Sequence, residues 1–297
     1  MTTDPVFDHD DVRQLLEVAV AEDLREEGDV TSRVIPEDAL CHAQLVYRAG
    51  GVVCGLPLAQ QVLDRIAPRA TWSATHADGD RVEPGTVVAE LRGPAREVLA
   101  AERLLLNFLQ RLSGVATATR TFADAIHGTS AKVLDTRKTT PGWRLLEKYA
   151  VRTGGGENHR FGLHDQILLK DNHLAMLGGE ARIADVIARA RAAAPPNTPV
   201  EIEVTTQEGA LEACRAGADI VLLDNFDPPT LAVAVEKVRH DAHERGVEPP
   251  LLEASGGIDL ETIVSFAQTG VDRISTGWIT HSSPALDIAL DFVQSEA

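Results

Sequence analysis

Basic residues gather in one stretch of an otherwise acidic chain. The 297 residues carry a formal net charge of -17, yet the segment 137–173 is rich in arginine, lysine and histidine. The residues Arg137, Lys138, Arg160 and Lys170 stand at predicted strand ends or in a glycine-rich loop. Long cationic side chains that converge on one place bind ligands with several negative charges. The segment therefore predicts a site for a polyanion.

The other basic residues of this segment have different interpretations. His159 precedes Arg160 and is the histidine that we expect to contact the ligand. The residues Arg144, Lys148 and Arg152 are spaced four apart, which is typical of the solvated face of a helix.

Two carboxylates near predicted strand ends form a second candidate group. Glu203 lies in the run EIEVT and Asp224 in the run LLDNF. Carboxylates in these places could accept hydrogen bonds from sugar hydroxyls or help hold a divalent cation. Each could instead only cap the helix that follows its strand. Glu201 shares a face with Glu203, and we prefer Glu203 because it is nearer the carboxyl end of the run.

Two glycine-rich turns follow late apolar runs. They are Ser255-Gly256-Gly257 and Ser275-Thr276-Gly277. Glycine lets the backbone approach a phosphate closely, and the start of the next helix offers free N–H groups. Two such turns on consecutive strands favour a phosphate site of the kind common at the mouth of (β/α) barrels.

The elements that must position these residues differ between the two halves of the chain. After residue 130, short apolar runs alternate with helical patterns, which predicts a parallel sheet covered by helices. Strand-end functional residues suit a (β/α) barrel, although a doubly wound open sheet would give the same alternation. Residues 1–114 are predicted to form an α+β domain, with a break in the helical pattern at Gly114, and residues 115–283 the barrel. The segment 284–297 is predicted to be a helix that packs back on the first domain.

Composition argues against several classes of binding partner and several cellular compartments. The strong negative charge argues against general affinity for nucleic acid or for an anionic membrane. The cysteines Cys41, Cys54 and Cys214 are few and widely spaced, which favours a reducing compartment over a disulfide framework. We find no apolar run that could span a bilayer and no signal pattern at the start, so we expect a cytoplasmic protein.

These motifs, taken together, resemble one enzyme family. The segment DTRKTTPGWRLLEKYAVRTGGGENHRFGLHDQILLKDNH resembles the core of quinolinate phosphoribosyltransferases, and so do EIEV, GADIVLLDNF, EASGGI and the final STG. The resemblance runs from about residue 20 to 295. It implies an N-terminal α/β sandwich domain and a C-terminal incomplete TIM-like α/β barrel, the type II phosphoribosyltransferase fold. It also implies a homodimer in which the N-terminal domain of one subunit closes the barrel mouth of its partner.

The resemblance implies a reaction and a role for each motif residue. The enzyme would transfer phosphoribosyl from phosphoribosyl pyrophosphate to quinolinate, releasing pyrophosphate and CO2 and giving nicotinate mononucleotide for NAD biosynthesis. The residues assigned to quinolinate are Arg103 of the neighbouring subunit, Arg137, Lys138, His159 and Arg160. Lys170 would lie near the reacting centre and the pyrophosphate. Glu203 and Asp224 would hold ribose hydroxyls with Mg²⁺ nearby, and Lys138, Lys170, Glu203 and Asp224 are the candidate catalytic residues. The residues assigned to the 5′-phosphate are Ser255, Gly256, Gly257 and Gly277.

Three other functions stay open from the sequence. A related phosphoribosyltransferase acting on nicotinate or another acid would need fewer cations at the base site. A barrel aldolase would use Lys170 as a Schiff-base former. A non-catalytic sensor would bind phosphoribosyl pyrophosphate without releasing pyrophosphate.

Overall fold

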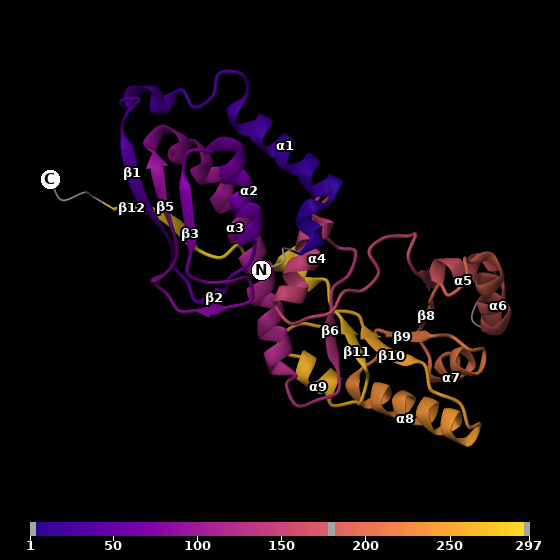
Figure 1. Cartoon of the computed structure of the whole chain (residues 1–297). Helices are drawn as coiled ribbons and strands as arrows, with labels where there is room; N and C mark the ends of the chain where they lie inside the picture. Colours follow the sequence, from indigo (N-terminus) through magenta and orange to yellow (C-terminus); the bar gives the residue numbers. More distant parts are fainter. Residues whose placement is uncertain (1–3, 178–181, 294–297) are drawn as a thin grey trace. The chain divides into compact units, whose positions relative to one another are not determined.

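The structure, a computed structural model, describes residues 4–177 and 182–293 and divides into two compact units (Figure 1). The first unit runs to Arg120 and also takes in Thr139–Gly155 and the chain from Thr280. The second comprises Thr121–Lys138 and Gly156–Ile279. This division differs from the predicted single boundary at Gly114, because the segment 139–155 belongs to the first unit and not to the barrel.

The first unit is built on a four-stranded antiparallel sheet in the order β12-β1-β5-β3. Alternate residues of β1, among them Ala43, Leu45 and Tyr47, are fully buried. The Tyr47 hydroxyl lies 2.9 Å from Ser113 Oγ on the long helix α3, so this face of the sheet forms the core with the helix. The strands are β1 (Leu40–Tyr47), β3 (Thr71–Ala74), β5 (Thr86–Pro94) and β12 (Ile288–Phe292). The other elements are η1 (Pro5–Asp8), α1 (Asp10–Leu24), η2 (Thr31–Val34), β2 (Gly51–Val52), α2 (Leu56–Ile66), β4 (Arg81–Val82), α3 (Ala95–Ala125) and α4 (Arg144–Thr153).

Helix α3 passes through Gly114 without a break, so the predicted interruption there is wrong. A Cβ atom at Gly114 would lie 2.1 Å from the carbonyl oxygen of Pro284. Glycine is therefore required by the close approach of the C-terminal segment and not by a turn.

We expect the substitution Gly114→Ala to destabilise the protein although alanine is the better helix former. The propensity gain of about 1 kcal/mol is smaller than the cost of displacing backbone, which is about 2 kcal/mol or more. Urea denaturation should show the lower free energy of unfolding. Gly50→Ala is the matched control, because its Cβ would meet no atom closer than 3.4 Å. Equal stability of the two variants would contradict the packing argument.

The C-terminal segment is a strand and not the predicted helix, with residues 294–297 outside the described part. Strand β12 pairs antiparallel with β1, and Leu290 lies opposite Leu45. Alternate residues Ile288 and Leu290 are buried, as a half-buried strand requires. The segment belongs to the first unit and extends its sheet.

The predicted solvated face on residues 144–152 is also wrong in part. Lys148 on α4 is completely buried, as is its neighbour Glu147. Arg111 Nη2 lies 2.7 Å from Glu147 Oε1, and the Thr140 hydroxyl donates to the same oxygen at 2.9 Å. Arg152 is exposed as expected and pairs with Asp4 at 2.9 Å. The helix therefore contributes to the core of the first unit on the side that carries Glu147 and Lys148.

The second unit contains six parallel strands in the order β6-β11-β10-β9-β8-β7. The first strand of this unit, β6, thus pairs with its last strand, β11. This is the order of a barrel that is open between its first and second strands, and it excludes a doubly wound sheet. The strands are β6 (Lys132–Leu134), β7 (Ile167–Leu169), β8 (Val200–Val204), β9 (Ile220–Asp224), β10 (Leu251–Ser255) and β11 (Arg273–Ser275). The incomplete TIM-like barrel is confirmed.

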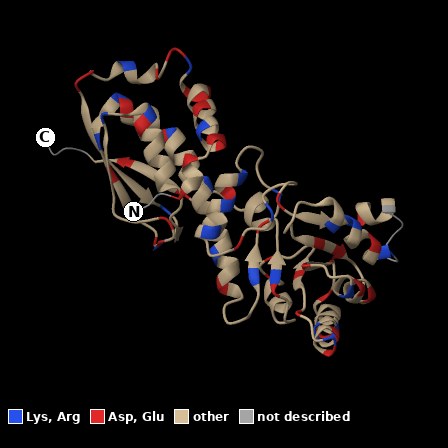
Figure 2. Ribbon diagram, turned by 45° about the vertical axis from the view of Figure 1, so that its right-hand side comes forward, with Lys and Arg blue, Asp and Glu red and all other residues tan. Residues whose placement is uncertain are grey.

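In the described part of this unit, five of these strands are followed in the chain by helical segments (Figure 1). They are α5 (Asp171–Leu177), α6 (Ile183–Ala193), α7 (Gln207–Arg215), α8 (Pro228–Glu244), α9 (Ile263–Ala267) and η4 (Trp278–Ser282). Acidic and basic residues are interspersed over the helices of each unit (Figure 2). Among the described residues, no helix combines the length and the hydrophobicity needed to cross a membrane.

Candidate functional site

Four predicted residues stand in a row at the carboxyl ends of neighbouring barrel strands. Lys170 follows β7 directly, Glu203 lies near the end of β8, and Asp224 and Ser255 end β9 and β10. Asp224 and Ser255 are paired across the strands. Lys170 Nζ lies 2.7 Å from Glu203 Oε2, and the Glu203 side chain is 11% exposed. The strand order thus brings residues far apart in the sequence to one edge, where barrel enzymes carry their active sites.

Neither Glu203 nor Asp224 caps the helix that follows it. Helix α7 is capped by Thr206, whose side chain accepts the N–H of Gly209. Helix α8 is capped by Asp227, whose side chain accepts the N–H of Thr230. The two carboxylates therefore do not act as helix caps. Both lie at the carboxyl-end edge of the barrel strands, which we call the barrel mouth.

The carboxylates and lysines of the mouth influence one another electrostatically. Burial, and after it the nearby charge of Glu203, raises the pKa of Asp224. The charges of Lys170 and Lys138 act in the opposite direction on the pKa of Asp224, which places the exposed Lys138 near this carboxylate. Two neighbouring carboxylates with oxygen donors fit a hard cation such as Mg²⁺.

Arg137 and Arg160 form a cationic pair in the same unit. Arg160 is 8% exposed, and its pKa is lowered by burial and then by the positive charge of Arg137. The positive charge of Arg137 thus acts on Arg160, and a bound anion would be attracted to both. The arrangement therefore suits a ligand with more than one carboxylate.

The two glycine-rich turns lie side by side, because β10 and β11 are neighbours in the sheet. Gly256 has a φ of +106°, and a Cβ atom there would lie 2.3 Å from Asn225 Oδ1. The Thr276 hydroxyl donates to the carbonyl of Ile258 at 2.8 Å and joins the second turn to the first. Ser255 and Gly257 lie in the first turn, and Gly277 ends the second. Adjacent turns with backbone of this kind are suited to phosphate oxygens.

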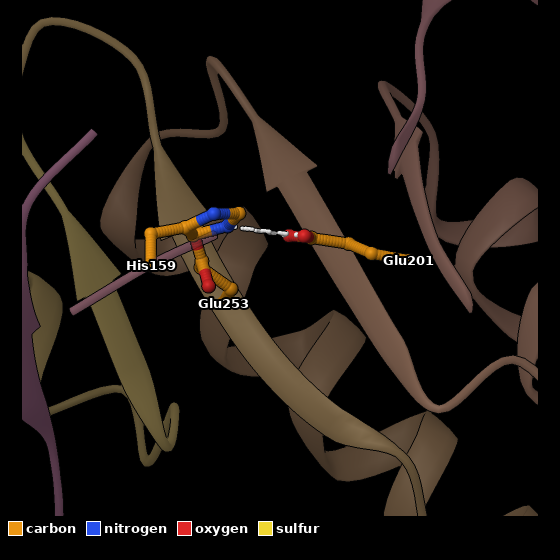
Figure 3. A group of neighbouring side chains, drawn as sticks. All are labelled: His159, Glu201 and Glu253. Carbon is orange, nitrogen blue, oxygen red and sulfur yellow. Dashed lines mark hydrogen bonds and ion pairs between the residues drawn. The ribbon is translucent and has the colours of Figure 1, made fainter. Parts of the chain in front are cut away.

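His159 lies among buried charged side chains of the barrel strands. Its side chain is 7% exposed, and its Nε2 lies 3.0 Å from Glu201 Oε2 and 3.3 Å from Glu253 Oε1 (Figure 3). Its Nδ1 lies 2.8 Å from the backbone nitrogen of Arg160, which donates to it. Both ring nitrogens thus lie close to protein atoms, and the predicted contact with a substrate carboxylate stays a prediction.

Glu253 and Arg273 were not predicted from the sequence as residues of the site. Arg273 Nε lies 2.9 Å from Glu253 Oε2, and Glu253 is fully buried. Glu253 precedes Ser255 by two residues, and Arg273 likewise precedes Ser275, so each shares a face with a residue of the mouth. The same spacing relates Glu201 to Glu203. This two-residue pattern could have indicated the deeper charged layer, which consists of Glu201, Glu253 and Arg273. The layer already contains the charge of Arg273, so we assign it no metal ion although His159, Glu201 and Glu253 converge.

Arg103 lies on the exposed side of α3 in the first unit. All other predicted site residues belong to the second unit.

Comparison with known proteins agrees with this geometry. Residues 115–291 match the quinolinate phosphoribosyl transferase C-terminal domain, and residues 29–113 match the N-terminal domain of the same family. The nicotinate-nucleotide pyrophosphorylase [carboxylating] of Mycobacterium leprae is 40% identical over 296 residues, which cover 98% of this chain and 100% of that protein. Quinolinate phosphoribosyltransferase [decarboxylating] 1 of Nicotiana glauca is 36% identical, over 94% of this chain and 82% of its own length.

A solved structure gives the same result. The nicotinate-nucleotide pyrophosphorylase from Francisella tularensis superposes with a TM-score of 0.89 at 39% identity, covering 98% of this chain and 100% of that chain. Identity of this level over nearly the whole length, together with both family domains in order, shows that the chain belongs to the quinolinate phosphoribosyltransferase family.

Proposed function

We propose that the barrel mouth binds quinolinate and phosphoribosyl pyrophosphate side by side and joins them with loss of pyrophosphate and CO2. The observation that carries this proposal is the cationic pair Arg137 and Arg160 in the unit that also holds the row from Lys170 to Ser255. A dicarboxylate and a sugar bearing phosphates are the ligands that such a set of groups would bind together.

Quinolinate has two adjacent carboxylates on a pyridine ring. Arg137, His159 and Arg160 bind them, with Lys138 contributing a further positive charge. Each charge-assisted hydrogen bond is worth roughly 1.5–3 kcal/mol, so several are needed to offset the removal of water from a dianion. A site for nicotinate, with one carboxylate, would need only part of this charge.

Phosphoribosyl pyrophosphate binds across the strand ends. Glu203 and Asp224 accept hydrogen bonds from the ribose hydroxyls, and the turns at Ser255 and Gly277 hold the 5′-phosphate. The two carboxylates would also hold Mg²⁺, which supplies positive charge to the pyrophosphate when it is bound.

The bond changes follow from the positions of these groups. The pyridine nitrogen attacks C1 of the sugar as the bond from C1 to the pyrophosphate oxygen breaks, and the bonding electrons leave with pyrophosphate. Lys138 and Lys170 stabilise the departing anion, where most new charge collects. The positively charged ring then accepts the electron pair released when the adjacent carboxylate leaves as CO2. A proton from solvent replaces that carboxylate on the ring carbon.

We further place the enzyme in the cytoplasm and assign it a homodimeric state with shared sites. The three cysteines are free, which is consistent with a reducing compartment. The dimer is proposed from the family resemblance, in which Arg103 of one subunit reaches the quinolinate of its partner.

One assay tests the reaction. The purified protein, given quinolinate, phosphoribosyl pyrophosphate and Mg²⁺, should form nicotinate mononucleotide with equal amounts of pyrophosphate and CO2. Nicotinate in place of quinolinate should react poorly, because it leaves one cationic site unfilled. Preference for nicotinate, or pyrophosphate binding without turnover, would favour the alternative functions.

A further inference from the structure

Asn225, the residue that follows strand β9, has an unusual backbone conformation. Its φ is +57°, in the left-handed region that residues with a side chain rarely adopt. The chain turns here from β9 toward α8. Glycine adopts this conformation without steric cost, and asparagine is one of the few other residues that tolerate it. An asparagine where glycine would serve the turn equally well indicates that its amide group is used.

The Asn225 amide lies between a carboxylate of the barrel mouth and the first glycine-rich turn. Its Nδ2 donates to Asp224 Oδ2 at 2.6 Å. At the opposite end of the amide, Oδ1 lies where a Cβ atom added to Gly256 would be only 2.3 Å away. The backbone N–H of Asn225 donates to the Ser255 carbonyl at 3.0 Å, which ties the residue to the end of β10. Both the backbone and the side chain of Asn225 are therefore held in place.

The neighbours of the amide also determine which way it points. A carboxylate accepts hydrogen bonds, so the NH2 group of Asn225 must face Asp224 and Oδ1 must face the turn. Any side chain at Gly256 would occupy the place of Oδ1. The missing Cβ atom of Gly256 thus leaves room for the Asn225 side chain, in addition to exposing backbone at the turn.

The Asp224 carboxylate ends a strand and is only half-buried, so packing alone does not fix its rotation. A carboxylate that is already oriented binds a ligand without losing further side-chain entropy. Glu203, the other carboxylate of the mouth, is held by Lys170 at 2.7 Å. We propose that Asn225 is a positioning residue that holds the Asp224 carboxylate in the orientation that accepts the ribose hydroxyls of phosphoribosyl pyrophosphate. The inference rests on the proposed function and adds to it a residue that acts through another.

The substitution Asn225→Gly removes the amide and keeps the turn, because glycine adopts the same backbone conformation readily. We expect it to raise the KM for phosphoribosyl pyrophosphate roughly tenfold, the worth of one hydrogen bond to a charged group, with the quinolinate KM within about twofold. If Asn225 served only the turn, the variant would have wild-type kinetics, and that result would overturn the proposal. Should Asn225→Gly fail to fold, as shown by its thermal unfolding, Asn225→Asp has nearly the same size and cannot donate to Asp224, so it should show at least the same rise.

Asn197 offers a matched control. It is also an asparagine in the left-handed region, with a φ of +65°, and it is exposed in the loop that precedes β8, at the amino end of that strand. The substitution Asn197→Gly should leave both KM values within about twofold of the wild type. An equal rise in the KM for phosphoribosyl pyrophosphate in Asn197→Gly would overturn the assignment of a specific role to Asn225.

A double-mutant cycle asks whether Asn225 acts through Asp224. In an Asp224→Ala background, Asn225→Gly should change kcat/KM for phosphoribosyl pyrophosphate by less than about twofold, because the carboxylate to be oriented is gone. A repeated tenfold loss in this background would mean that Asn225 binds the substrate itself, and it would overturn the positioning role.

Failure of the proposed reaction is recognised separately. If the wild type binds phosphoribosyl pyrophosphate with Mg²⁺ but does not turn over quinolinate, the same cycle is measured as dissociation constants by calorimetry, with the same expected ratios. Crystal structures of the wild type and of Asn225→Gly need no ligand at all. The Asp224 carboxylate should change its orientation in the variant, and an unchanged carboxylate would overturn the proposal whatever the reaction is.

Discussion

The substitution Arg137→Ala should raise the quinolinate KM by about a hundredfold or more, the equivalent of losing one or two charge-assisted hydrogen bonds. Arg137 is exposed in the turn after β6, and its charge is, after burial, the next cause that lowers the pKa of Arg160. Its removal leaves one carboxylate of the substrate without its partner, whereas the groups assigned to phosphoribosyl pyrophosphate stay in place. Steady-state kinetics with each substrate varied in turn would therefore show a large effect on one KM only.

A control separates this effect from a general loss of positive charge. Arg13→Ala removes an arginine on α1 whose side chain is 59% exposed and whose ion pair with Asp10 lies on the surface. Surface pairs of this kind contribute about 0–1 kcal/mol, so both KM values should stay unchanged. An Arg137→Ala enzyme with wild-type quinolinate kinetics would contradict the assignment of the cationic pair.

The sequence predicted the barrel unit more accurately than the first unit, for a physical reason. Buried strands followed by helices leave an alternation that is visible in a single chain. Which strand lies next to which is a matter of long-range pairing, so only the structure shows β6 beside β11. The segment around Ile288 was assigned to a helix because short apolar runs fit either period, and the free edge of β1 decides the outcome.

The mouth residues were predictable because strand ends are marked by polar residues after apolar runs. Glu203 and Asp224 are examples, and Lys170 is found where the pattern places it. Glu253 and Arg273 of the deeper charged layer were not predicted because they lie inside strands. In the sequence, such a charged residue cannot be distinguished from an exposed one, and only the folded structure shows that it is buried. For His159, the neighbourhood of Arg160 indicated the place, and only the structure shows that the ring lies close to Glu201 and Glu253.

Mixing two inactive variants should restore activity if the sites are shared between subunits. Arg103→Ala and Lys170→Ala should each lower turnover of quinolinate by at least about a hundredfold, since each removes a cation that acts on a substrate or leaving group. In a mixed dimer, the barrel of the first chain keeps Lys170 and receives Arg103 from the second chain. Random exchange makes half of the dimers mixed, each with one intact site, so about a quarter of the wild-type activity should return.

The matched control uses two defects in the same barrel. A mixture of Lys170→Ala with Asp224→Asn gives dimers in which every barrel carries one defect, so activity should not return. Co-expression with different purification tags yields the mixed dimers directly where exchange is slow. If the first mixture stays as inactive as its components, the active site is not completed by the partner. Full activity of Arg103→Ala alone would show that quinolinate is held by the barrel cations without help from α3.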